Sequence, residues 1–268
     1  MSHTPSARML RWLQYLFCAA VALFLVGPII TIIPLSFSSA SFLSYPIPAF
    51  SLQWYEKVFA ARPWMPALWN SVLSGAGAAS IATVLGTAAA LGLSRDDLPW
   101  RSGILALLIS PMIVPVVISG LGIYFLFAKL GLVATFTGMV LAHAALGAPF
   151  VVITVAATLR QFDRTLVRAA QSLGAGAARV FLTVTLPLIA PGVISGALFA
   201  FVFSFDEVVI ALFIAGPAQR TLPRQMFDGI RDNIDPSILA MSTLLVVVSM
   251  LMLTTVGLLS RPSRPKAE

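Results

Sequence analysis

Charged side chains are scarce in this chain. Only 10% of its 268 residues are Asp, Glu, Lys or Arg, whereas 59% are hydrophobic. Soluble domains carry about 25% charged residues, so this composition leaves too few charges to cover a surface in contact with water. The scarcity of charge excludes an ordinary soluble fold and predicts an integral membrane protein.

The residues that common catalytic motifs require are also few. The three lysines are Lys57, Lys129 and Lys266, and none follows a glycine, so the phosphate-binding loop G-x-x-x-x-G-K-[ST] is absent. The two histidines, His3 and His143, form no H-E-x-x-H motif for zinc. We therefore expect no catalytic residue, no metal and no cofactor in this chain.

One cysteine and one mid-chain histidine remain to be interpreted. Cys18 has no partner for an intrachain disulfide, and we expect it to be an apolar core residue. The apolar segment around it is longer than the hydrophobic region of a signal peptide, which favours an uncleaved anchor. His143 lies among Ala142, Ala144 and Gly147. This setting predicts close helix packing with one hydrogen bond, although a contact with a ligand is an alternative.

Six long stretches of the sequence contain no charge at all. Each is at least 25 residues long, whereas about 20 apolar residues cross a bilayer as a helix. We expect an all-α, polytopic membrane protein with six transmembrane helices, near Leu13–Ser36, Leu68–Leu93, Ser102–Ala128, Leu132–Leu159, Leu188–Ala215 and Ile238–Leu259.

The basic residues predict the orientation of these spans. With six spans both termini lie on one side, and that side carries eleven Lys and Arg residues against six on the other. Because cytoplasmic loops are enriched in Lys and Arg, both termini are predicted to be cytoplasmic. The net charge of +7 is then mostly a consequence of topology.

Small residues and prolines suggest how the helices pack. Residues recurring every four positions form two stripes, Ser74, Ala78, Ala82, Gly86 and Ala90 in the second span and Gly192, Gly196, Ala200 and Ser204 in the fifth. Such stripes let helix backbones approach closely in lipid. Pro111 and Pro115 are expected to kink the third span.

The cytoplasmic segment 160–187 is predicted to be a compact helix–turn–helix. From Asp163 to Leu173 the apolar residues Leu166, Ala169, Ala170 and Leu173 share one helical face. Gly174 and Gly176 are expected to stop this helix. A second short helix over 177–185 is expected to end before Leu186-Pro187, so the segment is suited to docking another protein.

This segment resembles the "EAA–G–LP" loop of permeases from binding-protein-dependent ATP-binding-cassette (ABC) importers. The resemblance implies that the loop couples the chain to an ATPase subunit through Arg168, Ala169, Ala170, Leu173, Gly174, Ala175, Leu186 and Pro187. One residue departs from the pattern, because Arg168 stands where the family usually has Glu. This reversal puts in doubt the polar contact that the Glu makes.

A pair of acidic residues lies in the fifth predicted span. The run FSFDE contains Phe203, Asp206 and Glu207, and a carboxylate at the centre of a bilayer costs roughly 2.5–3.5 kcal/mol. Adjacent helical residues point about 100° apart, which places Glu207 near the small-residue stripe and Asp206 on another face. We take the three residues as a candidate substrate path for a cation. Alternatively, an acid reaches the interface or pairs with an arginine such as Arg220.

Three runs, SFDE, GPAQRTLPRQMFDGIRDNIDPSILAMSTLLVV and FSSASFLSYPIPAFSLQWYEKVF, resemble the second permease subunit of spermidine/putrescine-type importers, and the resemblance covers most of the chain, about residues 10–260. The resemblance implies a type I importer bundle with a cytoplasmic N-terminus (1–12), a first span (13–36), a periplasmic loop (37–67), a permease core (68–259) and a cytoplasmic tail (260–268).

The same resemblance implies the partners of the chain. They are a homologous permease, two ATPase subunits that bind ATP and Mg, and a periplasmic or lipid-anchored binding protein. The chain itself is expected in a bacterial inner membrane. Another small solute, such as an amino-acid derivative, remains an alternative substrate, and a secondary cation transporter an alternative class.

Overall fold

The computed structural model describes residues 5–60, 63–95, 97–232 and 234–259. The predicted cytoplasmic tail 260–268 and the first four residues of the predicted N-terminal segment lie outside the described residues. Within the described ranges the chain is helical, and its only β pairing is a single bridge between Ser38 and Phe50. The expected all-α fold is confirmed for this part of the chain.

The helices follow one another with short connections. Their bounds are α1 (Pro5–Leu35), α2 (Gln53–Ala60), α3 (Trp64–Leu93), α4 (Arg101–Ile113), α5 (Val116–Leu130), α6 (Phe136–Arg160), α7 (Thr165–Ser172), α8 (Ala177–Val180), α9 (Leu186–Asp206), α10 (Val209–Ile214), α11 (Leu222–Asp232) and α12 (Ser237–Leu259). A π-helical turn (Phe181–Thr185) joins α8 to α9, and a 3-10 turn (Pro217–Gln219) precedes α11.

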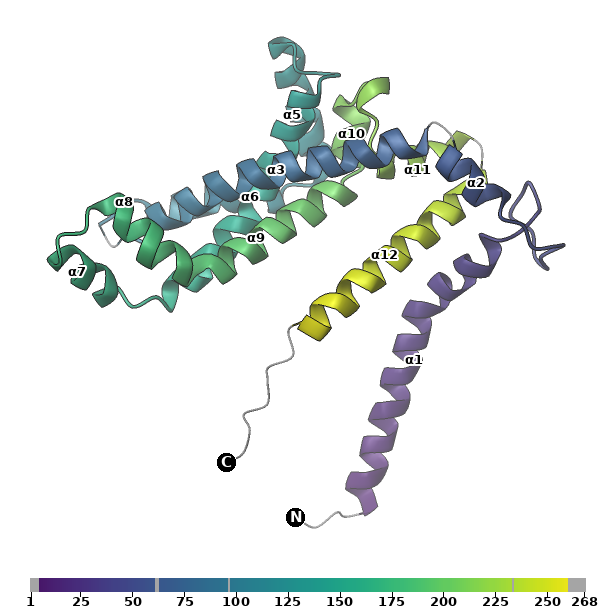
Figure 1. Cartoon of the computed structure of the whole chain (residues 1–268), viewed down its shortest axis with the longest axis horizontal. Coiled ribbons are helices and arrows are strands. Elements are labelled where there is room, and N and C mark those ends of the chain that lie inside the picture. Colours follow the sequence, from purple (N-terminus) through teal and green to yellow (C-terminus); the bar gives the residue numbers. More distant parts are fainter. Residues whose placement is uncertain (1–4, 61–62, 96, 233, 260–268) are drawn as a thin grey trace. The chain divides into compact units, whose positions relative to one another are not determined.

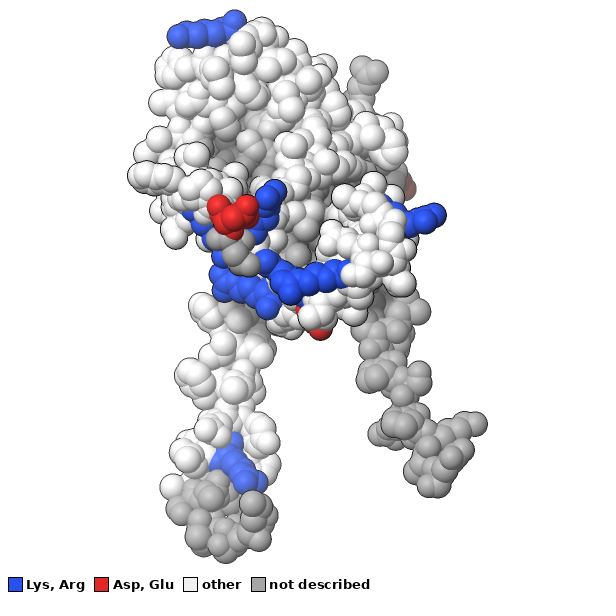
Figure 2. Space-filling model, turned by 90° about the vertical axis from the view of Figure 1, so that its left-hand side faces the viewer, with Lys and Arg blue, Asp and Glu red and all other residues white. Residues whose placement is uncertain are grey.

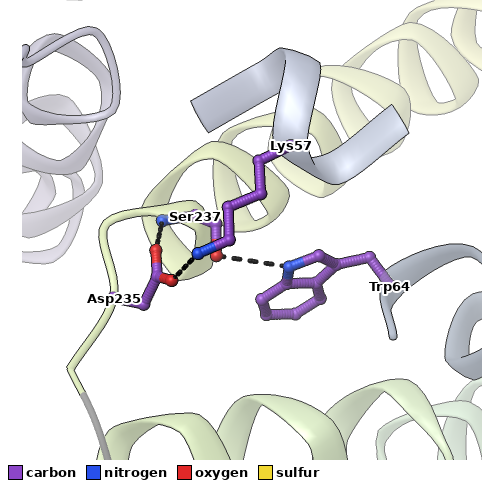
Figure 3. A network of polar contacts seen from close by, with 4 residues as sticks. All are labelled: Lys57, Trp64, Asp235 and Ser237. Atoms are coloured by element: carbon purple, nitrogen blue, oxygen red, sulfur yellow. Dashed lines mark hydrogen bonds and ion pairs between the residues drawn. The ribbon is translucent and has the colours of Figure 1, made fainter. Parts of the chain in front are cut away.

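The chain forms two compact units, 1–64 with 228–268 and 65–227. In the first unit α12 packs against both α1 and α2. Lys57 of α2 forms an ion pair with Asp235, and the indole N–H of Trp64 donates to the hydroxyl of Ser237 at 3.2 Å (Figure 3). The first contact joins α2, and the second the first residue of α3, to the beginning of α12.

The second unit is built around α3, α6 and α9, which run alongside one another (Figure 1). Every residue of the two predicted small-residue stripes is buried. A Cβ on Gly196 would lie 2.8 Å from the Cα of Val151, and one on Gly86 would lie 2.7 Å from the Cβ of Val151. The stripes therefore act as predicted, because only small residues let α3 and α9 approach α6 this closely.

His143 also lies in this packed core. It is fully buried on α6, and its Nδ1 lies 2.7 Å from the hydroxyl oxygen of Ser204 on α9. The predicted combination of close packing and one hydrogen bond to a neighbouring helix is confirmed.

The third predicted span is not one kinked helix. The structure divides it into α4 and α5, which are bent by 102° at Val114-Pro115. Pro115 cannot donate a backbone hydrogen bond, and it disfavours helical backbone at the residue before it. Val114 accordingly has an extended backbone, with ψ of 132°. The predicted interruption at Pro115 is therefore present as a full break between two helices, whereas Pro111 lies within α4.

Two further expectations need correction. The fifth span ends as a helix at Asp206 and does not continue to Ala215. Cys18 is exposed rather than a core residue, because the apolar stretch Met9–Leu35 of α1 is not buried against the rest of the chain. This exposed surface is suited to lipid or to another subunit.

In the part of the chain that the structure describes, four helices are long and apolar enough to cross a membrane, and there are five if α4 and α5 together make one crossing. Helix α12 begins and ends close to the sixth predicted span, and its stretch Ser237–Leu251 is apolar. The described residues thus show a polytopic membrane protein with four to five apolar helices of spanning length.

Candidate functional site

The predicted coupling segment contains a well-defined first helix, α7, at the end of the second unit that also carries α8 (Figure 1). Gly174 follows this helix with φ of +83°, its N–H donates to Gln171 at 2.9 Å, and the N–H of Ala175 donates to Ala170 at 3.1 Å. This pair of bonds is the Schellman arrangement that ends helices at glycine. Gly174 is confirmed as the stop.

Gly176 plays a different part from the one expected. Its φ of −67° and ψ of 160° are accessible to any residue, and it immediately precedes α8. It therefore begins the second helix rather than ending the first.

The apolar face of α7 is uncovered. Leu166 is 45% exposed and Leu173 is 88% exposed, while Ala169 is exposed and Ala170 is half-buried. An exposed leucine of this kind is unremarkable alone, but two of them on one face of an ordered helix mark a surface that a partner protein can cover.

The second helix of the segment does not end at Leu186-Pro187. It passes through the π-helical turn, in which the N–H of Leu186 donates to the carbonyl of Phe181, and continues into α9. Pro187 has no backbone N–H to donate. The wider π turn before it tolerates the hydrogen bond that is therefore missing from the helix. Leu186 packs against the α3–α6–α9 core, so α8, the π turn and α9 form one continuous element that ends in this core.

Positive charge dominates this end of the molecule. Figure 2 views it and shows more Lys and Arg than Asp and Glu side chains. Arg168 is exposed on α7. The N–H of Thr165 donates to Asp163 at 2.8 Å, and this hydrogen bond lowers the pKa of the exposed Asp163 carboxyl. Asp163 therefore supports the start of α7 as an ionised group.

The two acids of the fifth predicted span occupy different environments. Asp206 is the last residue of α9 and is exposed, whereas Glu207 is buried. The Oε1 of Glu207 accepts hydrogen bonds from the N–H groups of Val209 (2.7 Å) and Ile210 (3.1 Å) and so caps α10. The capping bonds favour a new helix start over continuation of α9, which explains why the span ends there.

Within the described residues neither acid forms an ion pair, so the suggested pairing with Arg220 is not observed. Sequence analysis placed Glu207 near the packed stripe and Asp206 on another face, and the two residues do differ in burial. The basis of this difference is not the expected one, because a helix end separates the two residues rather than a helical angle.

Phe203 lies beside the break between α4 and α5. It lines a cavity of about 310 Å³ together with residues 111–116 and two residues of α6, Leu146 and Phe150. The rings of Phe203 and Phe150 are 5.3 Å apart between centroids. The side chains that line the cavity are thus all apolar, and they include Pro115 at the helix break and the two aromatic rings.

Sequence reasoning did not identify Phe150 or the helix break as part of this site. The break had a local signal, since two prolines four residues apart interrupt an apolar run. Phe150 had none, because it meets Phe203 only when α6 packs against α9.

Comparison with known proteins agrees with this architecture. The family model described as "Binding-protein-dependent transport system inner membrane component" matches residues 82–264. The putrescine transport system permease protein PotI of Escherichia coli (strain K12) is 34% identical over 230 residues, which cover 83% of this chain and 82% of that relative.

Two further proteins are similar over nearly the whole chain. The spermidine/putrescine transport system permease protein PotC of Haemophilus influenzae is 30% identical over 251 residues, covering 93% of this chain and 97% of the relative. A chain from the crystal structure of a bacterial ABC transporter involved in the import of the acidic polysaccharide alginate has a TM-score of 0.79 and covers 98% of this chain and 100% of its own, at 14% identity. That last likeness shows the fold alone. The chain belongs to the family of inner-membrane components of binding-protein-dependent transport systems and is a permease subunit of an ABC importer.

Proposed function

We propose that this permease subunit forms half of the translocation path for a small organic cation of the polyamine type, such as spermidine or putrescine. The observation that carries the proposal is its similarity, over more than four fifths of its length, to two permeases named for polyamine transport. Another small solute, such as an amino-acid derivative, remains the alternative substrate.

The proposed path includes Asp206, Phe203 and the α4–α5 break. The exposed carboxylate of Asp206, at the end of α9, can replace part of the water that a cation loses when it enters the path. The apolar cavity beside Phe203 suits the methylene chain of a polyamine. Glu207 contributes to the structure, because its carboxylate is occupied by the N–H groups of α10.

The proposed topology has six crossings, with α4 and α5 together making one broken crossing. Both termini then lie in the cytoplasm of a bacterial cell, with 1–12 and 260–268 as cytoplasmic ends and 37–67 as a periplasmic loop around the first span (13–36) and the core (68–259). The excess of Lys and Arg on the side of the termini supports this orientation.

In the proposed assembly this chain pairs with a homologous but different permease. Two separate ATPase subunits bind ATP and Mg and hydrolyse the ATP, and an extracytoplasmic binding protein delivers the substrate. The segment 160–187 docks the ATPase through the exposed face of α7. Arg168 there would meet an acidic group on the ATPase, since its charge is opposite to that of the family's usual Glu.

The test is uptake of labelled putrescine by the reconstituted transporter carrying Asp206→Asn, with Glu207→Gln as the matched variant. Losing a charge pair with a partly desolvated cation slows uptake by about 10–100-fold. Asp206→Asn should therefore reduce uptake strongly at normal expression. Glu207→Gln keeps an oxygen for the α10 N–H groups and should change uptake little while lowering thermal stability.

Wild-type uptake by Asp206→Asn would remove Asp206 from the path. Failure of the wild-type transporter to take up any polyamine, together with uptake of another cation, would favour the alternative substrate.

A further inference from the structure

A second, larger cavity lies at the end of the second unit that carries the coupling segment. It has a volume of about 700 Å³ and is enclosed by the ends of α3 and α6 and the beginning of α4. The apolar cavity beside Phe203 is lined by other residues, and none of the coupling residues of α7 lines this larger one. The proposed path and the docking face of α7 therefore do not account for it, although Arg160, Phe162 and Arg164 of its wall belong to the segment 160–187.

The rim of this cavity is basic. Arg101, Arg160 and Arg164 line it, and no acidic side chain is among the described residues of its wall. Arg164 donates a hydrogen bond to the carbonyl of Ser94, which joins the segment after α6 to the end of α3. The other two guanidinium groups, of Arg101 and Arg160, belong to exposed residues and take part in no ion pair within the described chain.

The beginning of α4 adds backbone donors to the same rim. Its N-cap residue, Trp100, makes no side-chain capping bond, and the first two residues of the helix, Arg101 and Ser102, line the cavity. The first N–H groups of a helix have no intrahelical acceptor and carry a partial positive charge. A phosphate is the usual ligand of such an end when arginines stand beside it.

The wall below the rim is apolar. On each of the three helices the lining residue four positions from the rim has no polar side chain: Ala90 on α3, four residues before Ser94 at the end of that helix, Leu105 after Arg101 on α4, and Ala156 before Arg160 on α6. Residues four apart lie on one face, about 6 Å apart along the axis. The cavity thus changes from basic to apolar within one helical turn.

We propose that this cavity binds an anionic phospholipid, with the headgroup phosphate between Arg101, Arg160 and the first turn of α4 and an acyl chain along Leu105 and Ala156. A soluble phosphate compound would use the basic rim but would leave the apolar wall unfilled. An acidic surface of the ATPase would do the same. A phospholipid matches both halves, and basic pockets between membrane helices are known sites for anionic headgroups.

The test uses the assembled transporter in nanodiscs of phosphatidylcholine, with or without phosphatidylglycerol. Each arginine near an anionic surface strengthens lipid binding by about fivefold, so Arg101→Gln with Arg160→Gln should weaken it by about 30-fold. We expect phosphatidylglycerol to copurify with the wild-type transporter and to raise its melting temperature, and we expect the double variant to lose both effects. Arg179→Gln, an exposed arginine outside the cavity, should retain both.

Two results would overturn the proposal. If inorganic phosphate raises the melting temperature in phosphatidylcholine as much as phosphatidylglycerol does, the ligand is a soluble phosphate. If the double variant keeps its lipid but loses the ATPase subunit on purification, the rim is a protein interface. Equal lipid retention by all variants would also contradict the site.

Discussion

At the scale of single residues, the segment 160–187 depends most on Gly174, where the absence of a Cβ permits the backbone conformation that ends α7. Its positive φ lies in the region that residues with a Cβ avoid, and both bonds that end α7 depend on that conformation. Gly176, two residues later, has an ordinary backbone and open space around its Cα. The two glycines therefore form a natural pair of test and control.

Gly174→Ala should insert and assemble normally but lose part of the stimulation of ATPase activity by the binding protein. A Cβ in the left-handed region costs roughly 1–2 kcal/mol, which loosens the end of α7, where we propose that the ATPase docks. The measurement is stimulated ATPase activity in reconstituted transporter, and Gly176→Ala should match the wild type. Equal loss in both variants would show that any added Cβ disturbs docking, whatever the backbone.

At the scale of elements, the connection between α2 and α12 depends on a partly exposed ion pair. Asp235 accepts hydrogen bonds from Lys57 and from the N–H of Ser237. Partial burial raises the pKa of its carboxyl, but these hydrogen bonds and the charge of Lys57 outweigh burial and lower the pKa below 3.8. An ion pair at this exposure contributes at most about 1 kcal/mol.

The contribution of this pair should depend on pH in one direction. Because the folded-state pKa is lowered, the stabilisation is fully present above the unfolded pKa and is lost as pH falls through the folded one. Asp235→Asn keeps the acceptor for Ser237 and removes the charge. Amides of α2 should exchange with solvent faster in this variant than in the wild type at neutral pH, and the difference should vanish well below pH 4. An unchanged difference at low pH would assign the effect to the hydrogen bonds instead.

At the scale of the whole molecule, the bend between α4 and α5 decides the topology. If the two half-helices make one crossing, both termini lie on the same side. If they enter and leave on one side, the later helices are inverted and the termini lie on opposite sides. The basic residues favour the first arrangement.

Reporter fusions can distinguish these topologies. A reporter active only in the cytoplasm should be active when fused at either terminus and inactive when fused after Gly131, which follows α5. Activity at the N-terminus and after Gly131, without activity at the C-terminus, would establish the re-entrant arrangement. A cysteine labelling experiment on a Cys18→Ser background provides an independent check, since Cys18 is the only cysteine.

The sequence alone determined the class of protein, the packed stripes and the helix that ends at Gly174, because each depends on composition or on spacing along one helix. The absence of charge over long stretches, the small residues of α3 and α9, and Gly174 after a helical run act through local geometry. These features can be predicted without knowing which other helices pack against them.

Only the tertiary structure decided where two predicted helices end and what their side chains meet. The strength of the bend at Val114-Pro115 depends on how α5 packs against α10, and Glu207 caps α10 only because the chain turns there. Phe203 contacts Phe150, and Arg101 lines the same cavity as Arg160, although the two residues of each pair are far apart in sequence. The sequence periodicity of one helix does not predict which face of another helix will pack against it.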